Sequence, residues 1–386
     1  MIAQILTPRM MLIGGDAAQE IALVLHKLGV HRPLIVTDPF MRDSGMLKHV
    51  TDPLDSAGIR WDLFADTVPD PTTDVVEAGL GRLRLGTFDS LIAFGGGSPM
   101  DTAKAMNALA ALGGRMRDHK VPKAADKSAV PLICIPTTAG TGSEVTKFCV
   151  ITDTETDEKM LIMGLGCLPT AARVDYKLPM KKPFRLTADT GIDSITHAVE
   201  AYVSKKRNPM SDVYALTAMR RLYTHIRTAC FEPENEQARE QMMLGATQAG
   251  MAFSNASVAL VHGMSRPIGA FFHVPHGLSN AMLLPAVTEF SAEAALDRYA
   301  DCARAMGIAP EDEGNQSAVN RLIDGLRRLN DDLKVPTPKA YGIDEARYME
   351  LLGTMASQAL ASGSPGNNPR VPDEAEIIDL YKRVYA

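Results

Sequence analysis

Asp193, His197, His262 and His276 are the residues whose types and spacing best suit chemistry. Asp193 and His197 stand four residues apart in a segment without helix-breaking residues, so a helix places both on one face. His262 and His276 bound a stretch of fifteen residues that holds three of the chain's nine histidines. One carboxylate with two or three imidazoles suits a borderline divalent ion such as Fe(II), Zn(II), Mn(II), Co(II) or Ni(II).

Each of these residues also has an ordinary interpretation. Asp193 and His197 can form a surface pair worth a few tenths of a kcal/mol, and the later histidines can be hydrogen-bonded core residues. Taken together, the clustering favours a metal site. The set contains no cysteine, which argues against a structural zinc site of the cysteine-rich kind.

The bulk composition limits the class of protein. A chain of 386 residues with 46% hydrophobic residues predicts two well-packed domains. The net charge of −6 is spread without blocks of like charge, so nucleic acid and anionic membranes are poor partners. The chain shows no signal peptide and no apolar run long enough to span a membrane. Its five scattered cysteines are typical of reduced thiols in a cytoplasmic protein.

The first half of the chain alternates strand-like and helix-like segments. Residues 33–38 and 89–94 are apolar runs that predict buried strands, and each run is preceded by a helical pattern, at residues 17–28 and 75–83. Continuous apolar strands separated by helices are typical of a parallel sheet covered on both faces. We therefore expect an α/β domain over residues 1–184.

The second half of the chain is helical throughout. A proline-flanked segment, residues 179–183, predicts a hinge before it. We therefore expect an all-helical domain over residues 185–386 that carries the metal-ligand candidates. Its amphipathic segments are 211–226, 236–253, 292–306, 316–329, 344–359 and 373–385.

A glycine loop follows the strand at residues 89–94. Gly96 and Gly97 allow a ligand to approach the backbone, and Ser98 or Asp101 is suited to cap the helix that follows, whose free N–H groups attract a pyrophosphate. Met100 stands where the full dinucleotide fingerprint needs its last glycine. The loop alone is therefore weak evidence for a nucleotide site.

A second loop and an aspartate strengthen the nucleotide interpretation. Thr137, Thr138 and Thr141 follow the buried strand at residues 132–135, and open α/β sheets bind ligands at such strand ends. The alternative is a glycine-rich turn whose threonines cap themselves. Asp38, also at a strand end, can accept both ribose hydroxyls of an adenosine and would repel a 2′-phosphate, which favours NAD over NADP.

Three long motifs resemble those of the iron-dependent (group III) alcohol dehydrogenases. They are GGGSPMDTAK from Gly95 to Lys104, PTTAGTGSE from Pro136 to Glu144, and GMAFSN from Gly250 to Asn255 leading into the histidine cluster. The resemblance covers essentially the whole chain. It implies an N-terminal Rossmann-like α/β domain and an all-α C-terminal domain, in the two-domain architecture of dehydroquinate synthase.

The resemblance also assigns roles residue by residue. The family's metal ligands fall on the four residues named at the outset. Its cofactor contacts fall at the two loops, at the strand-end aspartate and at a lysine near the nicotinamide ribose, and two phenylalanines resemble positions that narrow the alcohol pocket. The expected cofactor residues are Asp38, Asp70, Gly96, Gly97, Ser98, Asp101, Thr137, Thr138, Thr141 and Lys159, and the pocket residues are Phe148 and Phe253.

Two positions depart from the family pattern. Many members carry a histidine four residues after the third ligand, and this chain has Arg266, whose guanidinium cannot act as a base. We therefore expect His273, a ribose hydroxyl or water to carry the proton. Arg266 pairs with a carboxylate of the helical domain or holds an anionic substrate tail. Asp70 stands where relatives commonly carry Asn, so the side chain at this cofactor position is a carboxylate and not an amide.

The sequence thus predicts an NAD-dependent, metal-dependent alcohol dehydrogenase or aldehyde reductase. The ion expected is Fe(II), with Zn(II) or Mn(II) as alternatives, and the substrate is a short alcohol or aldehyde. We also expect a homodimer or larger homo-oligomer. A dehydroquinate synthase-like cyclase or lyase and a non-catalytic nucleotide-binding protein are the alternative functions.

Overall fold

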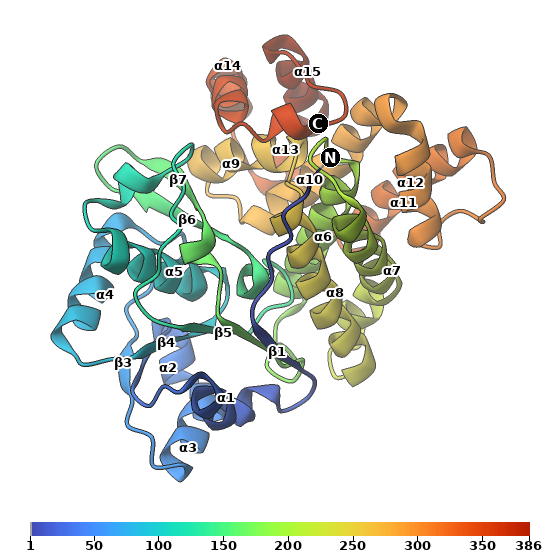
Figure 1. The fold of residues 1–386 in the computed structure, drawn as a ribbon. Coiled ribbons are helices and arrows are strands. Elements are labelled where there is room, and N and C mark those ends of the chain that lie inside the picture. The colour runs from blue at the N-terminus through green and yellow to red at the C-terminus, as the bar shows by residue number, and fades with distance from the viewer. Residues whose placement is uncertain (1) are drawn as a thin grey trace. The chain divides into compact units, whose positions relative to one another are not determined.

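The computed structural model describes residues 2–386, which form two compact units (Figure 1). The first is Leu6–Lys181, and the second is Lys182–Ala386 together with residues 2–5. The change of unit falls within the predicted hinge, residues 179–183. Residues 2–5, which the sequence analysis placed with the α/β domain, belong instead to the helical unit.

The α/β unit is built on a parallel six-stranded sheet of order β1-β8-β5-β4-β2-β3. From β2 the chain goes outward to β3 and then returns to the other side of β2 as β4, so the topological switch point lies between β2 and β4. The strands of the sheet are β1 (Met10–Ile13), β2 (Pro33–Val36), β3 (Asp62–Phe64), β4 (Ser90–Gly95), β5 (Leu132–Pro136) and β8 (Ala171–Val174).

Helices cover both faces of this sheet because the buried strands are apolar on both sides. Alternate residues of β4 face opposite cores: Leu91 and Ala93 pack with α4 and α5, and Ile92 packs with α1 and α3. An antiparallel hairpin, β6 (Phe148–Asp153) and β7 (Glu158–Met163), was not predicted from the sequence. The helices are α1 (Ile21–Leu28), α2 (Pro39–Asp43), α3 (Lys48–Ser56), α4 (Thr73–Leu85) and α5 (Gly97–Leu112).

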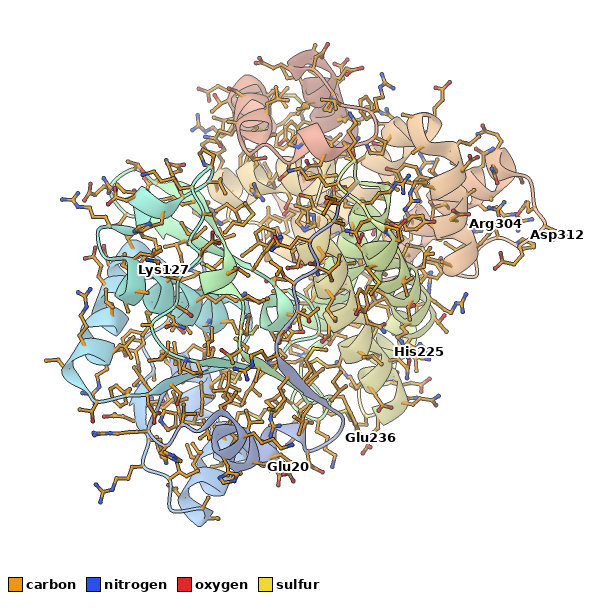
Figure 2. All side chains as sticks on the ribbon, viewed as in Figure 1. Glu20, Lys127, His225, Glu236, Arg304 and Asp312 are labelled. Carbon is orange, nitrogen blue, oxygen red and sulfur yellow. The ribbon has the colours of Figure 1, made fainter. Side chains whose placement is uncertain are left out.

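The second unit consists of helices, as predicted. Charged side chains such as those of Glu236 and Asp312 are exposed (Figure 2). Its helices are α6 (Phe184–Val203), α7 (Pro209–Phe231), α8 (Glu236–Asn255), α9 (Leu260–Phe272), α10 (His276–Ser291), α11 (Leu296–Ala305), α12 (Asn315–Asp332), α13 (Pro338–Tyr341), α14 (Glu345–Ala361) and α15 (Glu374–Tyr385).

Two further predictions concern cysteines and membranes. All five cysteines are free and buried, as expected for packing residues. Among residues 2–386, none of the helices has the length and apolar character needed to cross a bilayer.

Candidate metal centre and cofactor loops

Helix α6 carries three functional side chains on one face. Asp193, His197 and Glu200 follow each other at spacings of four and three residues, which line up along a helix. All three are buried. The helix begins at Phe184, directly after Pro183.

Helices α9 and α10 supply the other two imidazoles. His262 lies in the first turn of α9, and His276 is the first residue of α10. Between the two helices the chain turns at His273, which adopts a left-handed conformation with φ of 54°. Pro275 then occupies the N-cap position of α10. The short break allows two helices to direct histidines toward α6.

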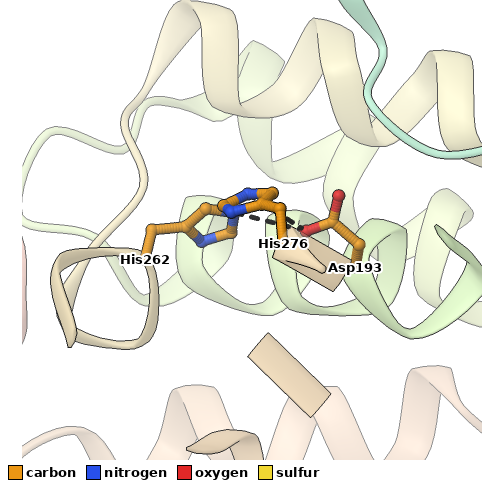
Figure 3. Close-up of side chains that lie close together, drawn as sticks. All are labelled: Asp193, His262 and His276. Atoms are coloured by element: carbon orange, nitrogen blue, oxygen red, sulfur yellow. Dashed lines mark ion pairs between the residues drawn. The ribbon is translucent and has the colours of Figure 1, made fainter. Parts of the chain in front are cut away.

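Three of the four predicted ligands converge in the structure, and the fourth, His197, lies beside them. Asp193 Oδ1 lies 3.5 Å from His262 Nε2, 3.8 Å from His276 Nε2 (Figure 3) and 3.9 Å from His197 Nε2. The donor atoms of Asp193, His262 and His276 all lie within 4.8 Å of one another. The ring of His197 stacks on that of His262 at a centroid distance of 4.5 Å. The structure thus brings one oxygen donor and two nitrogen donors together and places the His197 ring beside them.

Glu200 holds His262 in the orientation that this set requires. His262 Nδ1 donates to Glu200 Oε2 at 2.6 Å, which leaves Nε2 directed toward Asp193. The same carboxylate accepts hydrogen bonds from the backbone N–H groups of Ala259 at 2.9 Å and Val261 at 2.6 Å. Glu200 therefore also caps the start of α9. A carboxylate behind a histidine is a common support of metal sites.

The protonation of the donor set follows from burial and from neighbouring charges. Burial lowers the pKa of His197 to about 3, against the opposing effect of Asp193, so its imidazole is neutral. Burial alone would lower the pKa of His262, but Glu200 and Asp193 raise it to about 9. Burial would raise the pKa of Asp193, but the surrounding imidazoles, with His197 first, hold it below its usual range. A cation bound here would displace the His262 proton.

Two buried polar atoms at the set have no hydrogen-bond partner within residues 2–386. They are His197 Nδ1 and Asn280 Oδ1. Buried polar groups are nearly always paired, so two unpaired atoms on side chains next to the donors indicate that the polar groups here lack a partner species. A carboxylate with three imidazoles is chemically suited to a divalent transition metal. The residues present therefore fit such an ion.

In the α/β unit, the two predicted cofactor loops lie against each other. Gly95 has a φ of 150°, and a Cβ there would lie 2.7 Å from Pro99 Cγ, so only glycine fits. A Cβ on Gly97 would lie 3.0 Å from Thr141 Cγ2. Helix α5 starts at Gly97 with no side-chain cap. Its first N–H groups are therefore available to an anion, as predicted.

Asp38 lies at the switch point of the sheet. Its Oδ1 accepts a hydrogen bond from Met41 N at 2.8 Å and so caps α2. Its Oδ2 would lie 3.5 Å from a Cβ on Gly95, so the carboxylate borders the glycine loop. Thr137 Oγ1, on the neighbouring β5 loop, is buried without a hydrogen-bond partner within residues 2–386. Both features indicate a polar ligand at this edge.

Comparison with known proteins decides the family. The N-terminal family model for iron-containing alcohol dehydrogenases matches residues 8–176, and the C-terminal model for Fe-containing alcohol dehydrogenases matches residues 187–385. The chain belongs to the iron-containing alcohol dehydrogenase family. It is an alcohol oxidoreductase, active as an alcohol dehydrogenase or aldehyde reductase, and the alternatives of a cyclase or lyase and of a non-catalytic protein are set aside.

Individual relatives agree with this assignment. The chain is 35% identical to the NAD-dependent methanol dehydrogenase of Bacillus methanolicus, over 97% of this chain and 98% of that protein. A crystal structure of 1,3-propanediol oxidoreductase superposes with a TM-score of 0.95 at 34% identity and full coverage of both chains. Sulfoacetaldehyde reductase from Bifidobacterium kashiwanohense in complex with NAD+ gives a TM-score of 0.90 at 28% identity, covering 100% of this chain and 99% of that one.

Three further residues of the helical unit were predicted to take part in the function of this iron-containing alcohol dehydrogenase: Phe253, Arg266 and His273. Phe253 stacks on the ring of His197, with centroids 4.3 Å apart. Arg266 lies one turn after His262 in α9, which continues through Pro267. His273 is exposed at the end of α9. It does not join the donor set.

Asp101 and Ser98 differ from their predicted capping roles, because Gly96 is the N-cap of α5. The Asp101 carboxylate is instead directed inward, accepting hydrogen bonds from Ser143 Oγ at 2.8 Å and Val150 N at 2.9 Å. Burial raises its pKa. Beside it, the buried Lys104 Nζ donates to Ser143 Oγ and to two further groups of the second loop. Asp101 and Lys104 therefore join α5 to the second loop.

The hairpin carries the remaining predicted cofactor residues. Lys159 in β7 forms an ion pair with Asp70 at 3.1 Å, and Asp70 adopts a φ of 51° that aspartate and asparagine tolerate best. Phe148 begins β6 and is half-buried. The Asp70 carboxylate, which departs from the family pattern, thus has a local partner in Lys159.

Sequence reasoning did not assign Glu200 or Asn280 to the donor set. A signal existed for both, since Glu200 stands three residues after His197 and Asn280 stands four after His276. Each spacing places the second residue on the ligand's face of its helix.

Proposed function

We propose that this protein is an NAD-dependent dehydrogenase of short alcohols and aldehydes, whose ion is held by Asp193, His197, His262 and His276. The observation that carries the proposal is the convergence of the donor atoms of Asp193, His262 and His276, with His197 Nε2 3.9 Å from Asp193 Oδ1. We further propose a cytoplasmic homodimer or larger homo-oligomer that acts on small molecules.

The chain's own residues support this chemistry in distinct ways. A divalent ion supplies Lewis acidity to an alcohol or carbonyl oxygen, and NAD accepts or supplies hydride. Glu200 orients His262, and the stacked ring of Phe253 covers His197 on one side. The first turn of α5 is suited to the pyrophosphate, and Asp38 is suited to the adenosine ribose. Ser98, Thr138 and Lys159 are proposed as further cofactor contacts.

The basic test uses the metal-loaded protein with NAD and a panel of short alcohols. NADH absorbance should rise with at least one alcohol and should disappear after a strong chelator removes the metal. It should return when Fe(II) is added back. A rate that is unchanged after verified metal removal would reject the proposed role of the donor set.

The cofactor proposal makes a prediction at Asp38. We expect NAD to be preferred over NADP by at least about 30-fold in kcat/KM, about 2 kcal/mol, because a 2′-phosphate would lie beside a like charge. Asp38→Asn should remove most of this preference and should keep the hydrogen bond from Met41 N that caps α2. Asp38→Gly should also relax it. The measurement is kcat/KM with each cofactor.

Asp43→Asn is the matched control for this prediction. Asp43 is an exposed carboxylate at the end of α2 that pairs with Arg42. Its substitution should leave the ratio of the two cofactors unchanged. Comparable efficiency of the wild-type protein with NAD and NADP would contradict the proposed role of Asp38.

The substrate proposal concerns Arg266. Burial lowers the pKa of its guanidinium and Glu200 partly offsets this, but an arginine remains charged at any physiological pH. Glu200 is the carboxylate whose charge acts on Arg266, but the oxygens of Glu200 already accept hydrogen bonds from α9. Pairing with Glu200 and binding of a substrate anion are the two roles open to this guanidinium. We propose that Arg266 receives the anionic tail of a short aldehyde or hydroxy acid.

One relative is named for sulfoacetaldehyde, a short aldehyde that ends in a sulfonate, which supports this substrate class. Arg266→Ala should raise the KM for an aldehyde ending in a sulfonate or carboxylate at least about tenfold, about 1.4 kcal/mol. An uncharged aldehyde of equal length should be nearly unaffected. Arg266→Lys keeps the charge but cannot form the bidentate hydrogen bonds. Its KM for the anionic aldehyde should therefore lie between those of the wild type and Arg266→Ala. Equal losses for both aldehydes, or a wild-type preference for the uncharged one, would rule this out.

A further inference from the structure

Helix α10 presents a second side chain to the donor set besides His276. The amide nitrogen of Asn280 lies 2.6 Å from Asp193 Oδ1 and 3.2 Å from both His262 Nε2 and His276 Nε2. Asn280 has no exposed surface. An atom this close to three donor atoms borders the point where they converge. Whatever group Asn280 directs there is therefore a direct neighbour of a bound ion.

The two ends of the Asn280 amide have opposite polarity. Its NH2 group donates to Asp193 Oδ1 and also faces the two imidazole nitrogens. Its Oδ1, on the other side, is buried without a hydrogen-bond partner within residues 2–386. If the amide turns over, Oδ1 faces the Asp193 carboxylate, which repels it unless a cation stands between them. The favoured orientation thus depends on a cation.

We propose that Asn280 faces the metal ion through Oδ1 and adds a second oxygen to the donor set. The inference rests on the proposed ligands Asp193, His197, His262 and His276. Carbonyl oxygens suit Mn(II) and similar hard ions, whereas Zn(II) is satisfied by four nitrogen, oxygen or sulfur ligands. Asn280 therefore biases the site toward Mn(II) and Fe(II) over Zn(II).

The test is metal affinity rather than catalysis. Chelator-stripped protein is titrated with Mn(II) and with Zn(II) against a competing indicator. Asn280→Ala should weaken Mn(II) binding at least about tenfold and Zn(II) binding less than about threefold. Asn280→Asp has the same shape and keeps an oxygen, so it should bind Mn(II) at least as tightly as the wild type. The visible spectrum of the Co(II)-loaded protein should intensify in Asn280→Ala, as the coordination number falls.

Asn330→Ala is the matched control, because the Asn330 amide also bonds to α10, at Ala281 O, but does not touch the donor atoms. It should leave both affinities and the Co(II) spectrum unchanged. Unchanged affinities in Asn280→Ala, or equal losses of both metals with an unchanged Co(II) spectrum, would overturn the proposal. Weaker Mn(II) binding by Asn280→Asp would do the same, and this variant decides the matter if Asn280→Ala does not fold. Failure of the wild-type protein to bind metal would instead reject the proposed ligand set.

Discussion

His276→Ala protein should lose its bound metal and its dehydrogenase activity together. One of three imidazoles that converge on Asp193 is removed, and a metal ion contributes several kcal/mol to such reactions. We expect kcat/KM to fall at least about a thousandfold, about 4 kcal/mol. Metal content by elemental analysis and NADH formation are the two measurements. Binding of NAD, measured by fluorescence titration, should persist because the proposed cofactor residues lie in Leu6–Lys181.

His273→Ala provides the matched control. His273 lies three residues before His276, but its side chain is exposed and outside the donor set. The variant should keep its metal. A change in the pH dependence of its rate would indicate that His273 conducts the proton. Full activity of metal-free His276→Ala, or metal loss in His273→Ala with retention in His276→Ala, would show that the ligands are assigned wrongly.

Substitution of Glu200 should have the second largest effect. Glu200→Gln keeps the side-chain length but removes the charge that fixes the His262 tautomer, and substitutions of such supporting carboxylates typically weaken metal binding by about 10- to 100-fold. Glu200→Ala should weaken it further. That variant also leaves the Ala259 and Val261 N–H groups without their acceptor, at about 1–3 kcal/mol for each buried unpaired group. Titration with Zn(II) and thermal unfolding of the metal-free protein separate the two effects.

Asp301→Asn is the control for Glu200. Asp301 accepts a hydrogen bond from Tyr202 Oη of α6 but touches no imidazole of the donor set. Its substitution should lower the melting temperature without changing metal affinity. If Glu200→Gln binds metal as tightly as the wild type, then the hydrogen bond to His262 does not set its orientation.

Local patterns predicted most of the elements. The segment around Asp193 and His197 predicted a helix, which is α6, and the apolar runs predicted the strands β2, β4 and β5. The same patterns missed the β6–β7 hairpin, because β6 begins with four apolar residues in a row, although their burial alternates in the structure. They also placed helix caps at Ser98 or Asp101. That prediction was wrong because Asp101 is bonded to Ser143 and Val150, which lie more than forty residues further along the chain.

The sequence predicted the proposed metal ligands of the candidate site but not the residues that position them. Residue types and clustering indicated the four donor residues. The contacts that position them join residues distant in the chain: Glu200 reaches His262 across 62 positions, and Asn280 reaches Asp193 across 87. Helical spacing indicates which face a residue occupies, but it does not indicate which other helix that face meets. Tertiary packing supplied that information.

The path of the chain through its two units bears on how cofactor and metal preference can be exchanged between relatives. The α/β unit, Leu6–Lys181, is an insertion in the helical unit, because residues 2–5 precede it and Lys182–Ala386 follow it. A chimera with a single crossover near residue 181 would therefore replace residues 2–5 of the helical unit together with the α/β unit. Two crossovers, after residue 5 and after Lys181, would transfer Asp38 and both cofactor loops as a cassette. The four proposed ligands, Glu200, Asn280 and Arg266 would all remain with the recipient.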